Sequence, residues 1–94
     1  MVETRRGQAD VGACRLRICR DVCSREEFNA QRDRLPRAVR RDVEAVPPGH
    51  VGLIVQALAD PDSPVLAVYG YVRADLDPAE ALVALERRLR GLLG

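Results

Sequence analysis

The residues of this chain with the clearest chemical potential are three cysteines, Cys14, Cys19 and Cys23, in the spacing C-x4-C-x3-C. Cys19 and Cys23 bracket three residues, and Cys23 directly precedes a predicted helix start. The amides and the dipole of a helix N-terminus favour a thiolate at such a place. If the chain turns between Cys19 and Cys23, their sulfurs can meet and exchange between thiol and disulfide. This pair is therefore the candidate catalytic site, provided that it is redox-active.

Ordinary packing is the other interpretation of the cysteines. Cys14 alternates with Leu16 and Ile18, which places it on the core face of a strand as a small buried residue. Cys23 would pack against Phe28 as the hydrophobic staple of the following helix.

A zinc site is a third possibility, with Cys14, Cys19, Cys23 and His50 as its ligands. Cys14 and Cys19 are five residues apart and face opposite sides of a regular strand. The spacing also matches no common zinc motif. We therefore predict no metal and no cofactor, and we expect His50 only to open the second strand.

Two tyrosines supply the second candidate site. Tyr69 and Tyr71 share one face of a predicted edge strand, where exposed aromatic side chains suit contact with a partner. They are the candidate partner-binding residues. The alternative is that both are ordinary core residues.

These residues must be positioned by a small set of elements. The predicted order is a strand at 14–18, a helix from 24, a strand at 51–59, a strand at 65–73 and a helix opening at 77–80. Ser24 and Glu27 form a capping box, and Asp77 followed by Pro78 marks the last helix start. Pro36 either kinks the first helix or splits it into two pieces. Turn residues at 60–64 join the last two strands into a hairpin.

The order β-α-β-β-α predicts the α/β class, with a three-stranded mixed sheet and two helices. The sheet is mixed because a strand–helix–strand start favours a parallel crossover between the first two strands. Residues 1–12 are predicted to be a flexible N-terminal lead, and 13–94 a single small domain.

Composition narrows the function classes. The chain has 94 residues and a net charge of +1, and its basic residues are all arginine, as in proteins of high-GC bacteria. The near-neutral charge gives no reason to expect nucleic acid as a partner. No segment approaches the roughly 20 apolar residues of a membrane helix, and the start is not a signal peptide. We predict a cytoplasmic protein without a membrane partner.

A strand that ends in a two-cysteine loop, then a helix, a hairpin and a final helix, resembles a minimal thioredoxin-like domain such as the selenoprotein-W-like redox proteins. The segment 18–23 is also similar to the cysteine loop of thioredoxin-like 2Fe-2S ferredoxins of high-GC bacteria. The spacing departs from the C-x-x-C of redox thioredoxins, and no cysteine follows Cys23. A four-thiolate cluster within one chain is therefore excluded. The resemblance implies a thioredoxin-like fold that has lost its cluster.

Sparse catalytic side chains favour a non-enzymatic function. We expect a small interaction or assembly module that binds a protein partner or forms a homodimer. We expect it to derive from a thioredoxin-like protein that has lost its redox centre. The alternative is a thiol-redox protein that uses Cys19 and Cys23. Whether the chain is an enzyme stays open, with the balance against it.

Overall fold

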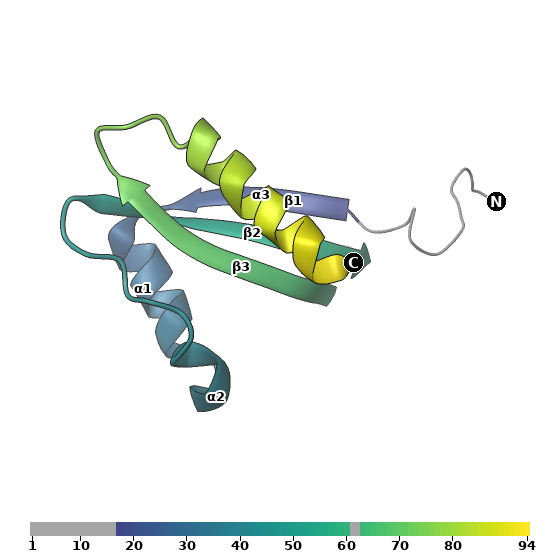
Figure 1. Cartoon of the computed structure of the whole chain (residues 1–94). Helices are drawn as coiled ribbons and strands as arrows, with labels where there is room; N and C mark the ends of the chain where they lie inside the picture. Colours follow the sequence, from purple (N-terminus) through teal and green to yellow (C-terminus); the bar gives the residue numbers. More distant parts are fainter. Residues whose placement is uncertain (1–16, 61–62) are drawn as a thin grey trace.

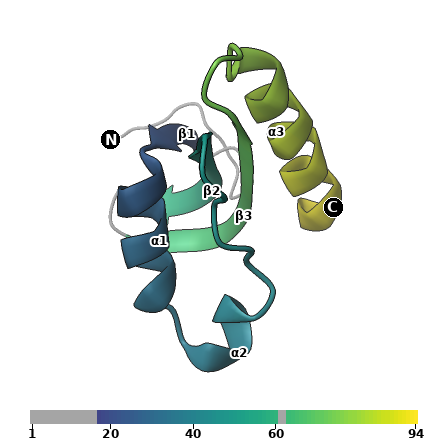
Figure 2. The ribbon, with the colours of Figure 1, turned by 90° about the vertical axis from the view of Figure 1, so that its left-hand side faces the viewer.

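The chain forms a three-stranded antiparallel sheet with helices on both faces (Figures 1 and 2). The structure, a computed structural model, describes residues 17–60 and 63–94. The elements are β1 (Arg17–Cys23), α1 (Arg25–Asp33), α2 (Arg37–Arg40), β2 (His50–Asp60), β3 (Ser63–Arg73) and α3 (Ala79–Leu93). The α/β class and the three strands are confirmed, and α2 is a short helix beyond the two predicted. The predicted lead at 1–12 and Cys14 lie outside the described residues.

The prediction of a mixed sheet is wrong. The sheet order is β1-β2-β3, and β1 runs antiparallel to β2, with Arg17 opposite Leu58 and Cys23 opposite Gly52. β2 and β3 form the predicted antiparallel hairpin. A thioredoxin-like arrangement is not confirmed, because the parallel crossover expected between the first two strands is replaced by an antiparallel pair.

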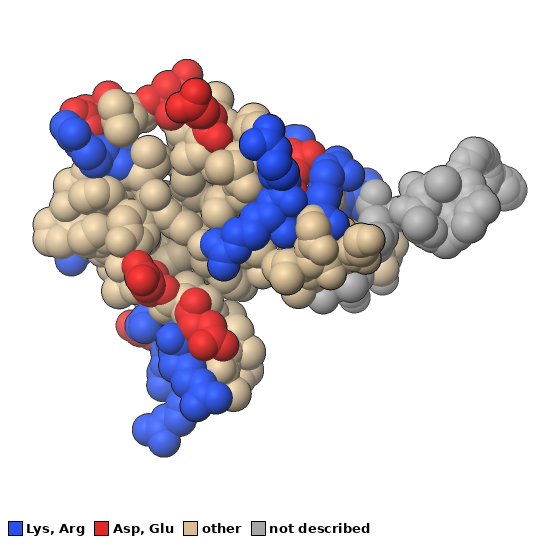
Figure 3. Space-filling model, viewed as in Figure 1, with Lys and Arg blue, Asp and Glu red and all other residues tan. Residues whose placement is uncertain are grey.

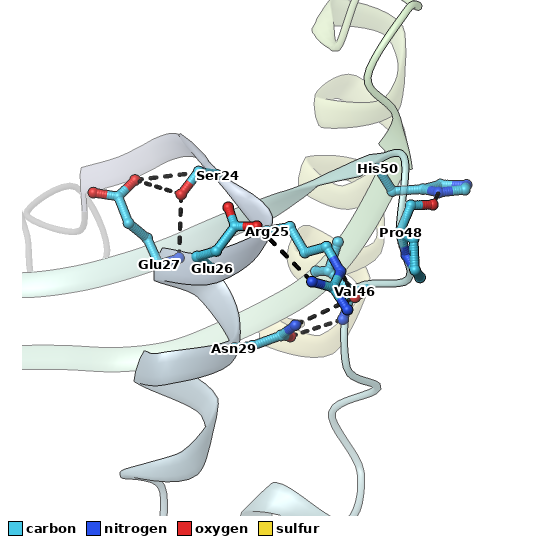
Figure 4. Close-up of polar contacts among 8 residues, drawn as sticks. All are labelled: Ser24, Arg25, Glu26, Glu27, Asn29, Val46, Pro48 and His50. Carbon is cyan, nitrogen blue, oxygen red and sulfur yellow. Dashed lines mark hydrogen bonds and ion pairs between the residues drawn. The ribbon is translucent and has the colours of Figure 1, made fainter.

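The segment between α1 and β2 sets the direction of β2. α1 ends at Asp33, and Pro36 opens α2, which confirms that Pro36 splits the predicted helix. The chain then returns along α1. The side-chain amide of Asn29 donates to the Val46 carbonyl at 3.3 Å, and the Val46 N–H donates to Asn29 Oδ1 at 2.8 Å (Figure 4). The chain thus re-enters the sheet beside the end of β1, so β2 has to run back along it.

The position of β1 differs from the prediction. The strand was expected at 14–18, with a loop from Cys19 to Cys23, but the structure places Cys19 to Cys23 within the strand. Pairing with the apolar strand β2 extends β1 through the polar residues Arg20 and Asp21. Tertiary pairing has overridden the low intrinsic strand preference of these residues.

The N-terminus of α1 is as predicted. Ser24 accepts from the Glu27 N–H at 3.1 Å, and the Glu27 carboxylate accepts from the Ser24 N–H at 3.3 Å (Figure 4). Cys23, which precedes the cap, is buried with Phe28 in one cluster. This contact is the hydrophobic staple that we expected as the structural role of Cys23.

Each face of the sheet has its own apolar cluster. Under α1 lie Cys23, Phe28, Val43, Val46 and Ile54. Under α3 lie Val55, Ala57, Val68 and Leu89, with Leu82 and Leu85 packed against them. Both faces of β2 are therefore covered. α3 begins one residue later than expected: Pro78 is the cap residue and Ala79 the first helical one, while Asp77 Oδ1 accepts from the Ala79 N–H at 3.1 Å.

Candidate interaction site

The two candidate redox cysteines lie on one strand. Cys19 and Cys23 are four residues apart on β1, opposite Gln56 and Gly52, and they face the same side of the sheet. Four residues of a strand span about 13 Å, whereas a disulfide needs Cα atoms within about 7 Å. The structure does not bring the two sulfurs together.

The surroundings of Cys23 oppose a thiolate. Its side chain is 5% exposed, and its sulfur lies 3.6 Å from the carboxylate of Asp21. Burial, then the charge and hydrogen bond of Asp21, then the charge of Glu27, raise the pKa of the Cys23 thiol to about 11. The helix start was expected to lower this pKa, but desolvation and neighbouring carboxylates outweigh the dipole. Cys23 is therefore a protonated, packed side chain at neutral pH.

The predicted tyrosine site lies on β3, an outer strand of the sheet (Figure 1). The ladder between β2 and β3 is regular from His50↔Arg73 to Ala57↔Leu66. The Ala74 N–H donates to the Gly49 carbonyl at 2.9 Å. Gly49 and Ala74, one step beyond His50 and Arg73, are therefore a hydrogen-bonded pair.

Hydrogen-bonded pairs alternate along an antiparallel ladder. Because Ala74 is hydrogen-bonded to β2, every second residue before it is too, so Val68 and Gly70 direct their backbone polar groups to β2. Ala67, Tyr69 and Tyr71 direct theirs to the open edge. Among residues 17–60 and 63–94, no other backbone hydrogen bond satisfies these three. The two candidate tyrosines are thus two of the three residues that present unpaired N–H and C=O groups.

The tyrosine side chains have different surroundings. The Tyr69 ring packs edge-on against Phe28, with ring centroids 6.1 Å apart, and burial raises the pKa of its hydroxyl. The Tyr71 side chain is 39% exposed, stands edge-on to His50, and its hydroxyl donates to Glu44 at 3.1 Å. Tyr69 therefore ties the edge to the core, whereas Tyr71 presents aromatic surface beside it.

A hollow of about 270 Å³ opens at this part of the edge. Asp42 and Glu44 line it from the segment before β2, and Arg88 lines it from α3. Since α1 and α3 cover opposite faces of the sheet, the hollow has acidic groups toward one face and a cation toward the other. No sequence pattern places these three charges together, because the course of the chain after α2 and its position beside α3 depend on contacts between distant residues.

The opposite edge of the sheet is less suited to pairing. β1 carries Arg17, Arg20 and Asp21 within seven residues, and Arg20 forms an ion pair with Glu86 of α3. Charges along an edge discourage the addition of another strand. β3 has no charged residue between Ser63 and Val72. The edge without charged residues along most of its length is therefore β3. The charges of β1 could be assigned to the other edge only once the structure had placed Arg20 and Asp21 in the strand.

Other site classes find little support in the part of the chain that the structure describes. In that part no three His, Cys, Asp or Glu side chains are placed to hold a metal ion, and Cys14 of the zinc alternative lies outside it. No helix there is long and apolar enough to cross a membrane. His50 opens β2 as predicted, with Nδ1 at 3.0 Å from the Pro48 carbonyl (Figure 4).

Comparison with known proteins assigns no class: no protein family, no curated protein and no solved structure matches this chain.

Proposed function

We propose that this chain is a non-enzymatic assembly module that forms a homodimer by pairing β3 with β3 of a second copy. The observation that carries the proposal is the outward-directed backbone of Ala67, Tyr69 and Tyr71, on a strand with no charged residue between Ser63 and Val72. Each unpaired group gains a hydrogen bond when a strand is added. A second copy supplies a strand of the same eleven residues and the same alternation.

Antiparallel pairing of two identical strands is closed by a two-fold axis, so it gives a dimer and not a filament. The two sheets join into one, and the faces that carry α1 become continuous. Tyr69 and Tyr71 of both copies then lie on one face near the junction, where cross-strand aromatic neighbours add stability. A 94-residue domain buries a modest fraction of its surface, so an added interface contributes noticeably to its stability.

Replacement of Ala67 by proline tests this proposal. Proline at position 67 removes an N–H that points to the open edge, so the ladder with β2 keeps its hydrogen bonds. The matched control is Ala67→Val, which changes the side chain and keeps the N–H. Sedimentation velocity over a wide range of concentration, at high salt so that contacts through exposed charges are screened, should show a dimer for the wild type and for Ala67→Val, and a monomer for Ala67→Pro.

Circular dichroism verifies that each variant is folded. Tyr71→Lys is a second edge variant, and it should also be monomeric because it brings a cation to the edge of both copies. A wild type that stays monomeric throughout, or an Ala67→Pro dimer as stable as the wild type, would contradict pairing through β3.

A further inference from the structure

The charges of α3 are segregated along its axis. Asp75, Asp77 and Glu80 lie before or within its first turn, whereas Arg87, Arg88 and Arg90 lie in its last two turns. Figure 3 shows the acidic side chains at the upper end of the helix and the basic ones further along it. The helix therefore has an acidic end and a basic end on the surface of the molecule.

One basic side chain is already paired. The Glu86 carboxylate contacts Arg90 at 2.9 Å and also Arg20 of β1, and the hydrogen bond from Arg90 is the main cause that lowers the pKa of Glu86. Within residues 17–60 and 63–94, no ion pair involves Glu80, Arg87 or Arg88. Among the described residues, the charged groups of Glu80, Arg87 and Arg88 therefore have no ion-pair partner within the chain.

Glu80 and Arg87 also share one face of the helix. They are seven residues apart, which is two turns, and Val83 and Ala84 lie between them on the same side. All four are exposed, and Val83 keeps 52% of its surface accessible, whereas Leu82, Leu85 and Leu89 on the opposite side pack on the sheet. The outer face has an apolar centre, with Glu80 toward one end of it and Arg87 toward the other. Val83 and Arg87 also line a shallow hollow, together with Arg20, Glu86 and Arg90.

We infer that this outer face pairs with the same face of a second copy, with the two α3 helices antiparallel. In that arrangement a two-fold axis passes between Val83 and Ala84. Glu80 of each copy then faces Arg87 of the other, so the contact contains two matched ion pairs. An unrelated partner would have to reproduce this charge order, whereas a second copy supplies it in the reversed direction.

This surface is separate from the β3 edge, and the inference does not depend on the proposed function. A single helix pair buries less than the interface of a stable complex, so the association is expected to be weak and concentration-dependent. Its exposed ion pairs are screened by salt, so it should weaken as the salt concentration rises. Backbone pairing through β3 should depend much less on salt.

Charge exchange between positions 80 and 87 tests the inference in the full chain. Glu80→Arg places two arginines opposite each other at both contacts, and Arg87→Glu places two glutamates there. Each single variant should weaken self-association by roughly tenfold or more, because like charges replace two matched pairs. The double variant restores opposite charges and should associate nearly as strongly as the wild type.

The measurement is sedimentation equilibrium of the wild type, the two single variants and the double variant at low and high salt. It is repeated with Ala67→Pro added to each protein, so that pairing through β3 does not mask the result. Loss in both single variants with recovery in the double variant supports the helix pair. Equal association of all four proteins, or a double variant as weak as the single ones, overturns it. All four proteins share the same β3 edge in each background, so a difference among them reports on the α3 contact alone and the two proposals fail separately.

Discussion

The Cys23 thiol lies among apolar side chains, and the charges that face it are the carboxylates of Asp21 and Glu27. A cysteine in this position behaves as a small hydrophobic residue and not as a nucleophile. The position of Cys23 directly before the cap residue Ser24 indicated the right residue for the helix staple. It could not indicate the pKa, because burial and the position of Asp21 depend on the pairing of β1 with β2.

The raised pKa of Cys23 predicts a loss of stability at alkaline pH. The unfolded chain releases this proton near the ordinary pKa of 9.0, whereas the folded chain keeps it up to about pH 11. The stabilising contribution is therefore complete below pH 9 and is lost as the pH rises to about 11. Urea unfolding of the wild type and Cys23→Ala over this range should show a steeper decline for the wild type. Parallel declines would mean that Cys23 is solvated in the folded state.

Gly52 is a second residue whose type is fixed by packing. A Cβ atom at this position would lie 2.6 Å from Cβ of Phe28 and closer still to its ring, whereas a Cβ at Gly91 meets nothing within 4 Å. Gly52→Ala should therefore lower the free energy of unfolding by about 1–3 kcal/mol, because Phe28 has to move. Gly91→Ala in α3 should raise it by about 0.5–1 kcal/mol. Thermal and urea unfolding measure the stability of both variants. Equal effects of Gly52→Ala and Gly91→Ala would contradict the close contact between Gly52 and Phe28.

At the scale of elements, the boundaries that depend on local chemistry could be predicted from the sequence. Ser24 and Glu27 form their capping box, Pro36 separates α1 from α2, and the Asp77 carboxylate accepts from the Ala79 N–H where α3 begins. These features involve residues within four positions of each other. The direction of β1 against β2 could not be predicted in this way, since it depends on contacts between residues far apart in the chain.

The contact between Asn29 and Val46 is the clearest of these distant contacts, and it predicts the effect of a substitution. Asn29→Ala leaves the Val46 N–H without its acceptor, while the Val46 carbonyl keeps the Arg25 Nε at 3.1 Å. The free energy of unfolding should fall by about 1–3 kcal/mol. Asn29→Asp retains an acceptor for the N–H and should cost less. Urea unfolding measures the stability of both variants. An unchanged stability of Asn29→Ala would show that other contacts hold the segment between α1 and β2.

The candidate site was predicted in part. Tyr69 and Tyr71 follow from strand periodicity, which places them on one face of an outer strand. Ala67 has no chemical signature, and its role follows only from the alternation of hydrogen bonds along the ladder. The same holds for Asp42 and Arg88, which reach the edge through the folding of two other segments.

At the scale of the whole molecule, the two sheet edges and the outer face of α3 determine how copies can meet. β1 is protected by its charges, whereas β3 is open and α3 is self-complementary in charge. If both of these surfaces are used, each copy has two different two-fold contacts, and copies can link into longer assemblies. High salt should then leave pairs joined through β3, because it screens the helix contact more strongly.

Amide hydrogen exchange along β3 tests pairing through this edge most directly. In a monomer the ladder protects the inward amides of β3, among them those of Val68 and Gly70, and leaves the outward amides unprotected. In the dimer that we propose, the outward amides of Tyr69 and Tyr71 are protected as well, and this protection should disappear in Ala67→Pro. Exchange at Tyr69 and Tyr71 that stays fast at every protein concentration, while Val68 and Gly70 remain protected, would contradict the account.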